Sequence, residues 1–114
     1  MTTNAMFWTD TTTALGGSAT FTGTGRDAFG TGTGALTSSF ALFNATFFAD
    51  QTGTAYIDYS SDNATWSVAR TSAITASTPL ALTAPVQAQF YRVRVVNGST
   101  AQGTLVVRSG FTTA

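Results

Sequence analysis

The sequence has 114 residues and no cysteine, and its five arginines and five aspartates cancel to a formal net charge of zero. A neutral chain lacks the positive charge with which proteins neutralise phosphates, so we expect neither nucleic acid nor an anionic membrane as a partner. The length suits one domain with a single hydrophobic core, for which nine Phe, three Tyr and two Trp provide material.

Residues 1–14 are predicted to form an amino-terminal arm, and residues 15–114 the folded domain. The arm is rich in Thr and carries an isolated apolar group, Met6, Phe7 and Trp8. Terminal segments are mobile unless they are tied down, and an apolar cluster on one suggests docking against a partner. We therefore expect these three side chains to bind a neighbouring subunit. The arm lacks the basic start and apolar run of a secretion signal, so we expect synthesis in a cytoplasm.

A glycine-rich stretch, residues 16–34, holds seven of the eleven glycines. It has neither the Gly-Lys-Ser/Thr ending of a phosphate-binding loop nor the glycine spacing of a dinucleotide-binding turn. We therefore predict a flexible loop around a short strand at Phe21. Such a loop could be ordered by a partner, so it is also a candidate contact element.

The middle of the chain shows the alternation of apolar and polar residues that is typical of strands. Residues 38–49 predict one bulged strand or two strands in succession, and residues 54–60 predict another strand. Asp62 and Asn63 predict a turn, because both types hydrogen-bond their own backbone and Asn accepts positive φ. The chain then returns in a strand that should place Trp66 and Val68 in the core.

The last third continues the same pattern. A short strand is predicted at 79–83, and another at 89–96 with Arg92 and Arg94 on its outer face. Tyr91, Val93 and Val95 should face the core. Asn97-Gly98 then predicts a hairpin to a strand with Leu105 and Val107 in the core, which would bring Arg108 near the other two arginines.

Short strands at intervals of about 8 to 12 residues, without helices between them, indicate an all-β fold. We predict a single antiparallel β-sandwich, jelly-roll-like or immunoglobulin-like. The sequence leaves the strand order open.

The residue types present argue against an enzyme. The chain contains no His, Cys, Lys or Glu, so it lacks the commonest general base, the thiol nucleophile, the Schiff-base amine and most zinc ligands. Asp58 and Asp62 could form a glycosidase pair or, with Asn63, a calcium site. A turn role for Asp62 and a solvent-facing role for Asp58 are favoured, since Asp is a preferred turn residue. We expect no catalytic residue, no metal and no cofactor.

Arg92, Arg94 and Arg108 are candidate partner-binding residues. Arginine is enriched at interfaces and offers bidentate, weakly hydrated contacts, so a cluster favours association between subunits. The alternative is that these arginines keep a sheet face hydrated or pair across it with Asp58.

Three quoted segments carry a family resemblance: "FTGTGRD", "FFADQTGTAYIDYSSDNATWSV" and "APVQAQFYRVRVVNGSTAQGTLVVRS". Their order over residues 20–108 resembles small all-β modules of tailed-bacteriophage structural proteins. The resemblance implies a virion protein, and the lack of a stalk or second domain favours a capsid decoration or cement protein on the capsid surface. It further implies a homo-oligomer, expected to be a trimer, that binds the major capsid protein.

The alternative is a fibre or tail attachment module that binds a host glycan or receptor. An exposed aromatic side chain would then stack on a sugar ring, and Trp8, Phe43 and Tyr56 are the candidates. The position of the protein on its particle, seen by electron microscopy, would separate the two hypotheses.

Overall fold

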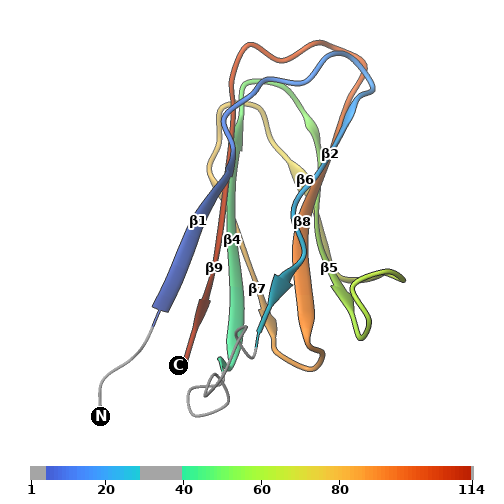
Figure 1. The fold of residues 1–114 in the computed structure, drawn as a ribbon. Helices are drawn as coiled ribbons and strands as arrows, with labels where there is room; N and C mark the ends of the chain where they lie inside the picture. The colour runs from blue at the N-terminus through green and yellow to red at the C-terminus, as the bar shows by residue number, and fades with distance from the viewer. Residues whose placement is uncertain (1–4, 29–39, 114) are drawn as a thin grey trace.

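A computed structural model describes residues 5–28 and 40–113 of the chain as a sandwich of two antiparallel β-sheets (Figure 1). Its strands are β1 (Ala5–Thr11), β2 (Thr20–Thr22), β3 (Arg26–Asp27), β4 (Leu42–Ala49), β5 (Gly53–Ser60), β6 (Ser67–Ile74), β7 (Leu80–Pro85), β8 (Phe90–Asn97) and β9 (Leu105–Thr112). No helix occurs within the described ranges, so they contain no helical membrane span. The predicted all-β antiparallel sandwich is confirmed.

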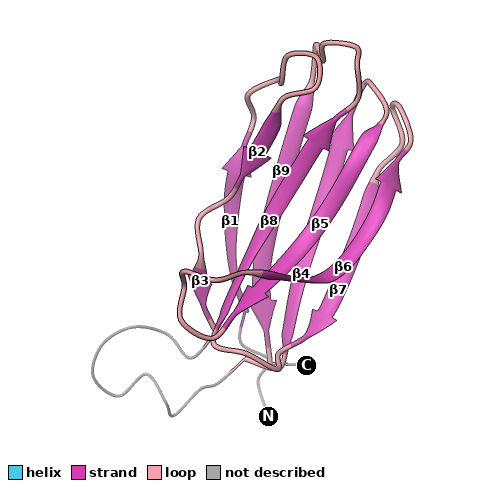
Figure 2. Cartoon of the chain, turned by 90° about the vertical axis from the view of Figure 1, so that its right-hand side faces the viewer, coloured by secondary structure: helices cyan, strands magenta, loops and turns pink. Residues whose placement is uncertain are grey.

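The four-stranded sheet has the order β1-β9-β4-β7. The five-stranded sheet has the order β2-β8-β5-β6, and β3 also pairs with β8. Figure 2 looks onto the five-stranded sheet, with the other sheet behind it. Among the described strands, β5 and β6 are the only pair that is consecutive in the chain and hydrogen-bonded together, so most connections cross between the sheets.

The hairpin predicted at Asn97-Gly98 is wrong, because β8 and β9 lie in different sheets. Asn97 is buried and its side-chain amide donates hydrogen bonds to the backbone carbonyls of Gly16 and Thr100, each at 2.9 Å. The backbone N–H of Gly98 donates to the carbonyl of Thr52. This Asn-Gly pair therefore anchors a connection that leaves the five-stranded sheet and does not turn back along it.

The core lies between the sheets and is built from alternate residues of the central strands. Tyr91, Val93 and Val95 of β8 are buried, as predicted, and they face Leu105 and Val107 of β9 across the sandwich. At one end of the core, four aromatic side chains pack around Phe111, with ring centroids 4.9 to 6.2 Å away: Trp8, Phe40, Phe43 and Tyr91.

The predicted amino-terminal arm is wrong for the part that the structure describes. Strand β1 pairs with β9 and forms one edge of the four-stranded sheet, so the sandwich begins before residue 15. Its apolar residues made it look like a docking segment because they do not alternate with polar ones. Trp8 contacts Phe111, whereas Phe7 lies on the opposite face of the strand.

The structure also shows which strands two other predicted segments form. The Phe-rich stretch forms one strand, β4, over its described part. The described part of the glycine-rich stretch forms β2 and β3, and Phe21 packs against the core. Residues 29–39 of these two predictions lie outside the described residues.

Candidate functional site

The outer face of the five-stranded sheet carries a row of ionic and aromatic side chains. Asp58 on β5 lies opposite Arg92 on β8 in the antiparallel register. The Asp58 carboxylate accepts hydrogen bonds from Arg92 Nε at 3.1 Å, from Arg94 Nε at 2.8 Å and from Arg94 Nη2 at 3.1 Å. Two arginines thus share one carboxylate, which they cover so well that its side chain is only 2% exposed.

Each of these arginines also stacks on an aromatic ring. The Arg92 Cζ atom lies 4.2 Å from the ring centroid of Trp66, and the Arg94 Cζ atom lies 3.9 Å from that of Tyr56. The hydrogen bonds from Arg94 to Asp58 raise the pKa of Arg94 above its ordinary value. We call these five residues the arginine ladder. Cation–π stacking and shared ion pairs both restrict the side chains, so the ladder holds its cations in fixed positions.

The prediction that Trp66 and Val68 lie in the core is wrong. A β-bulge in β6 shifts the register with β5, so that Ile57 opposes Arg70 while Asp58 opposes Val68. A shift of one residue moves every later side chain to the opposite face of a strand. Val68 is therefore 49% exposed on the outer side, and Trp66 is half-buried there.

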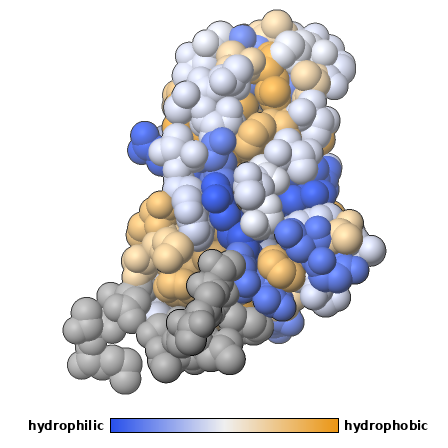
Figure 3. Space-filling view, viewed as in Figure 1, coloured by the Kyte–Doolittle hydropathy of each residue, from blue (hydrophilic) through white to orange (hydrophobic). Residues whose placement is uncertain are grey.

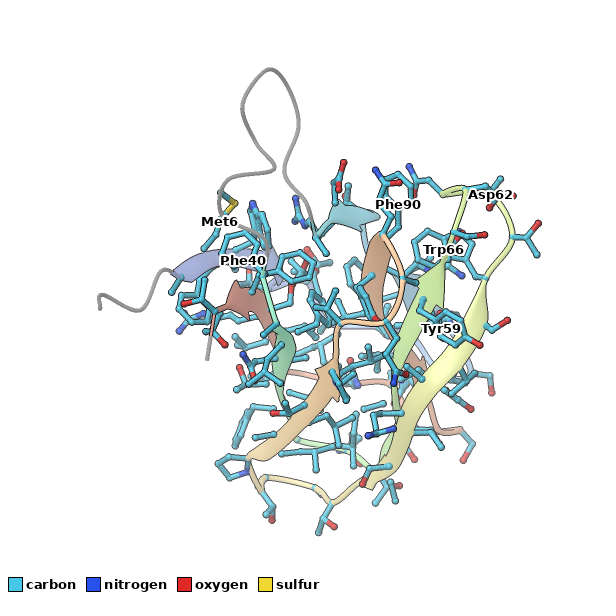
Figure 4. The ribbon with its side chains drawn as sticks, turned by 90° about the horizontal axis from the view of Figure 1, so that it is seen from below. Met6, Phe40, Tyr59, Asp62, Trp66 and Phe90 are labelled. Carbon is cyan, nitrogen blue, oxygen red and sulfur yellow. The ribbon has the colours of Figure 1, made fainter. Side chains whose placement is uncertain are left out.

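The indole ring of Trp66 lies close to the backbone of Gly25, at a position where a larger residue would not fit. A Cβ atom on Gly25 would lie 3.1 Å from the indole ring and would collide with the side chain of Asn63. Gly25 precedes β3, so the loop before that strand closes over the hairpin loop between β5 and β6. Figure 4 shows Trp66 near Phe90 at this end of the molecule, with Asp62 in the loop beside it.

The predicted turn at Asp62 and Asn63 is confirmed. Asn63 has a φ of 59°, and the Asp62 carboxylate accepts hydrogen bonds from the backbone N–H groups of Ala64 and Thr65, each at 2.9 Å. These bonds, with one from the Ser60 hydroxyl, lower the pKa of Asp62. Asp62 therefore serves the turn, as predicted. The solvent-facing role predicted for Asp58 is wrong, because Asp58 is 2% exposed and pairs with Arg92 and Arg94.

Arg108 does not join Arg92 and Arg94. It lies on β9 in the other sheet, opposite Thr9 and Thr46, and its side chain is exposed. The expectation of proximity failed because it depended on the hairpin that does not form. Arg92 and Arg94 face outward as predicted, and their pairing with Asp58 is the alternative that the sequence left open. Their role in association stays a prediction.

The three candidate residues of β1 lie in different environments. Met6 is 47% exposed and Phe7 is 64% exposed, whereas Trp8 is half-buried. The Phe7 ring lies over Gly110 of β9, where a Cβ atom would collide with it. Figure 3 shows hydrophobic surface gathered at this lower corner of the molecule, beside the grey atoms.

Trp8 takes part in a second, smaller ionic group. Arg26 of β3 places its Cζ atom 4.4 Å from the Trp8 ring centroid and forms an ion pair of 3.2 Å with Asp10 of β1. The other oxygen of Asp10 accepts a hydrogen bond of 2.6 Å from the Ser109 hydroxyl. This group, which the sequence did not indicate, ties the edge strand β1 to the opposite sheet.

The charged side chains of the arginine ladder and of the Arg26 group pair and stack with other residues of the same chain. Within the described ranges, no three His, Cys, Asp or Glu side chains come together in a way that could hold a metal ion. Of the three candidate sugar platforms, Phe43 is fully buried, and Arg26 and Arg94 stack on Trp8 and Tyr56. Phe43 is therefore not available to stack on a sugar ring, and an arginine covers one ring face of Trp8 and one of Tyr56.

The chain matches a protein family whose function is uncharacterised. The family model described as "Uncharacterised protein YqxG N-terminal domain" matches residues 1–112. No curated protein matches the sequence.

Among solved structures, the fold is similar to that of the PBSX exported protein XepA, with a TM-score of 0.82 and 22% identity. That alignment covers 93% of this chain and 36% of XepA, so the chain spans about a third of XepA's length. The SPBc2 prophage-derived protein YomS aligns with a TM-score of 0.63 and 9% identity over 98% of this chain and 96% of YomS. A protein of the Bacillus endospore appendages, described as disulfide-linked pili, aligns with a TM-score of 0.50 and 10% identity, over 99% of this chain and 87% of its own.

Proposed function

We propose that the chain, which belongs to the family of YqxG N-terminal domains, is a non-enzymatic structural protein of a bacteriophage particle. Within that class we propose a capsid decoration protein, which binds the major capsid protein on the outer surface of the shell and stabilises it. The prophage origin of YomS and the assembly of the endospore appendages support the class. The sequence motifs that resemble phage modules support it independently.

The observation that carries the proposal is the edge strand β1, which has no further strand beside it within residues 5–28 and 40–113. Proteins usually blunt the edges of their sheets with proline, charge, bulges or very short strands. Edge strand β7 ends in Pro85, and β6 has both a bulge and the exposed Arg70. The edge formed by β2 and β3 consists of three and two residues.

Strand β1 has none of these protections over most of its length. It has seven residues without proline, its irregularity comes at its end between Thr9 and Thr11, and its one charge, Asp10, faces Arg26. Beside this open edge stand the exposed side chains of Met6 and Phe7. An open edge offers unpaired backbone groups to a partner's strand, and the adjacent apolar side chains add burial. We therefore assign β1 as the contact that binds the capsid protein.

We further propose that the protein forms a small symmetric oligomer, a trimer. Capsid seams bring several copies of the shell protein together, and an oligomer can engage more than one of them at once. Linked contacts raise the overall affinity well beyond that of each single contact.

The experiment compares two variants that each add one lysine to an exposed edge-strand position, Phe7→Lys on β1 and Thr71→Lys on β6. Purified protein is mixed with capsids that lack it, sedimented, and viewed by electron microscopy. We expect wild type and Thr71→Lys to decorate the shell, and Phe7→Lys to stay in the supernatant. Equal decoration by both variants would reject β1 as the contact, and density at the tail alone would reject decoration.

The second candidate is a fibre or tail attachment module that binds a host glycan. A cleft at the far edge of the sandwich favours it, since it combines an exposed tyrosine with a cation. Localisation of the protein at a tail or fibre tip, by the same electron microscopy, would favour this candidate over decoration.

A further inference from the structure

A cleft of about 360 Å³ opens at the edge of the sandwich opposite β1, where β6 and β7 face each other. Its lining comes from both sheets and from the loop after β7: Tyr59, Val68, Ala69, Arg70, Ala84, Pro85, Gln87 and Tyr91. The volume lies in the range of small-molecule sites. Neither the arginine ladder nor the β1 edge contributes to it.

The wall formed by β6 is shaped by the β-bulge. The register pairs Ile57 with Arg70 and Asp58 with Val68, so Ala69 is the extra residue between them. All three β6 residues of this stretch line the cleft as a result. Bulges often re-aim side chains next to binding sites, and here the bulge brings a cation into an otherwise apolar wall.

Arg70 is the cation of this wall and is not neutralised. It is exposed, and its only hydrogen bond within the described chain goes to the carbonyl of the preceding residue, Ala69, at 2.9 Å. Arg26, Arg92 and Arg94, by contrast, each pair with an aspartate. The lining contains no Asp, so the cleft carries one net positive charge.

The opposite side of the cleft is rigid. The Tyr91 hydroxyl accepts a hydrogen bond of 2.7 Å from the backbone N–H of Gln87 and donates one of 3.0 Å to the carbonyl of Pro85. These bonds fix the loop that carries the Gln87 side chain, an exposed amide with both a donor and an acceptor. The loop is thus held in place without a ligand.

Tyr59 supplies a flat apolar surface in the same cleft. It stands opposite Tyr91 in the register, on the core-facing side of β5, yet it is 39% exposed. Figure 4 shows it on the side of the molecule away from Met6 and Phe40. No arginine stacks on its ring in the described structure, which distinguishes it from Trp8, Tyr56 and Trp66.

From this combination we propose that the cleft binds a carboxylate-bearing sugar residue of the hexuronic acid type. The pyranose face would pack on the Tyr59 ring, the carboxylate would pair with Arg70, and ring hydroxyls would bond the Gln87 amide. The inference is independent of capsid decoration and gives a ligand class to the second candidate. A neutral sugar would leave Arg70 without a counter-charge, and a purely apolar ligand would use neither Arg70 nor Gln87.

The test uses methyl β-D-glucuronide and methyl β-D-glucoside, which differ only in the carboxylate, with titration followed by NMR. We expect the glucuronide to shift the methyl signals of Val68, Ala69 and Ala84, and to bind about tenfold or more tightly than the glucoside, as charged hydrogen bonds allow. Arg70→Gln should abolish that preference, and Tyr59→Ala should weaken binding of both sugars. Arg108→Gln, which removes an exposed arginine from the other sheet, should change neither.

Four results would overturn the proposal: no shift with either sugar at millimolar concentrations, equal binding of the two sugars, an undiminished preference in Arg70→Gln, or tighter binding of acetyl-aspartate amide than of the glucuronide. The last result would assign the cleft to an acidic peptide. Because the assay uses the isolated protein and small probes, its failure leaves the capsid experiment unaffected.

Discussion

The arginine ladder and the β1 edge are two surfaces of one sandwich that treat their exposed groups in opposite ways. In the ladder, two cations share the carboxylate of Asp58 and rest on two aromatic rings. At the β1 edge, the large apolar side chain of Phe7 is 64% exposed and the strand has no neighbour on one side within the described structure. The difference teaches that residue type alone does not identify a contact surface, since the arginines here are already satisfied within the chain.

Among changes to the two surfaces, the largest expected effect comes from removing the cations of the ladder. The double variant Arg92→Ser with Arg94→Ser removes both ion-pair partners of the Asp58 carboxylate. We expect a loss of about 3 kcal/mol in the free energy of unfolding, measured in denaturant melts. Adding Asp58→Asn removes the orphaned charge and should restore part of the loss.

The same double variant also tests whether the ladder, like β1, binds a partner. Folded variant protein should have the wild-type oligomer mass in light scattering and should bind capsids as wild type does. A loss of either property at full folding would show that Arg92 and Arg94 serve association, as their clustering in the sequence suggested.

A smaller effect is expected for Trp66→Ala. Its indole is half-buried and stacks on Arg92, so we expect a loss of about 1 to 2 kcal/mol in unfolding free energy. Phe43→Ala, which empties a fully buried position, serves as the reference and should cost about 3 to 5 kcal/mol. Equal losses for the two variants would contradict the outward position of Trp66.

For β1, we expect a substitution that weakens binding to capsids but changes the free energy of unfolding little. Phe7→Ser removes only the contact of an exposed ring with Gly110, so the melts should show a loss below about 1 kcal/mol. Retention on capsids should nevertheless fall, because Phe7 stands beside the open strand edge. A loss of more than about 2 kcal/mol in the same melts would show that the ring is structural instead.

The smallest effect concerns pH and the turn beside the ladder. The hydrogen bonds to Asp62 hold its pKa below the 3.8 usual for an aspartate. A group whose pKa is lowered by folding stabilises the fold fully above its unfolded pKa, and this contribution is lost as the pH falls through the folded pKa. Asp62→Asn should therefore be less stable than wild type above about pH 5, and the difference should shrink below pH 3.8. Melts across this range would contradict the assignment if the difference stayed constant.

The sequence by itself determined the fold class and much of the core. Alternation along single strands is a local property, so the buried faces of β8 and β9 followed from it, as did the outward direction of Arg92 and Arg94. The positive φ at Asn63 followed from residue type, which is also local. The absence of His, Cys, Lys and Glu likewise limited the chemistry open to the chain, whatever its fold.

Only the tertiary structure decided which strands become neighbours, and the candidate surfaces depend on that. The partnership of Asp58 with two arginines needs β5 beside β8, although 34 residues separate Asp58 from Arg92. The bulge at Ala69 reversed the faces of Trp66 and Val68, because one extra residue inverts a period of two. The membership of β1 in the sheet was decided by its pairing with the far end of the chain. These pairings join strands that are far apart in the chain and have similar local patterns. Alternation within one strand therefore does not show which other strand lies beside it.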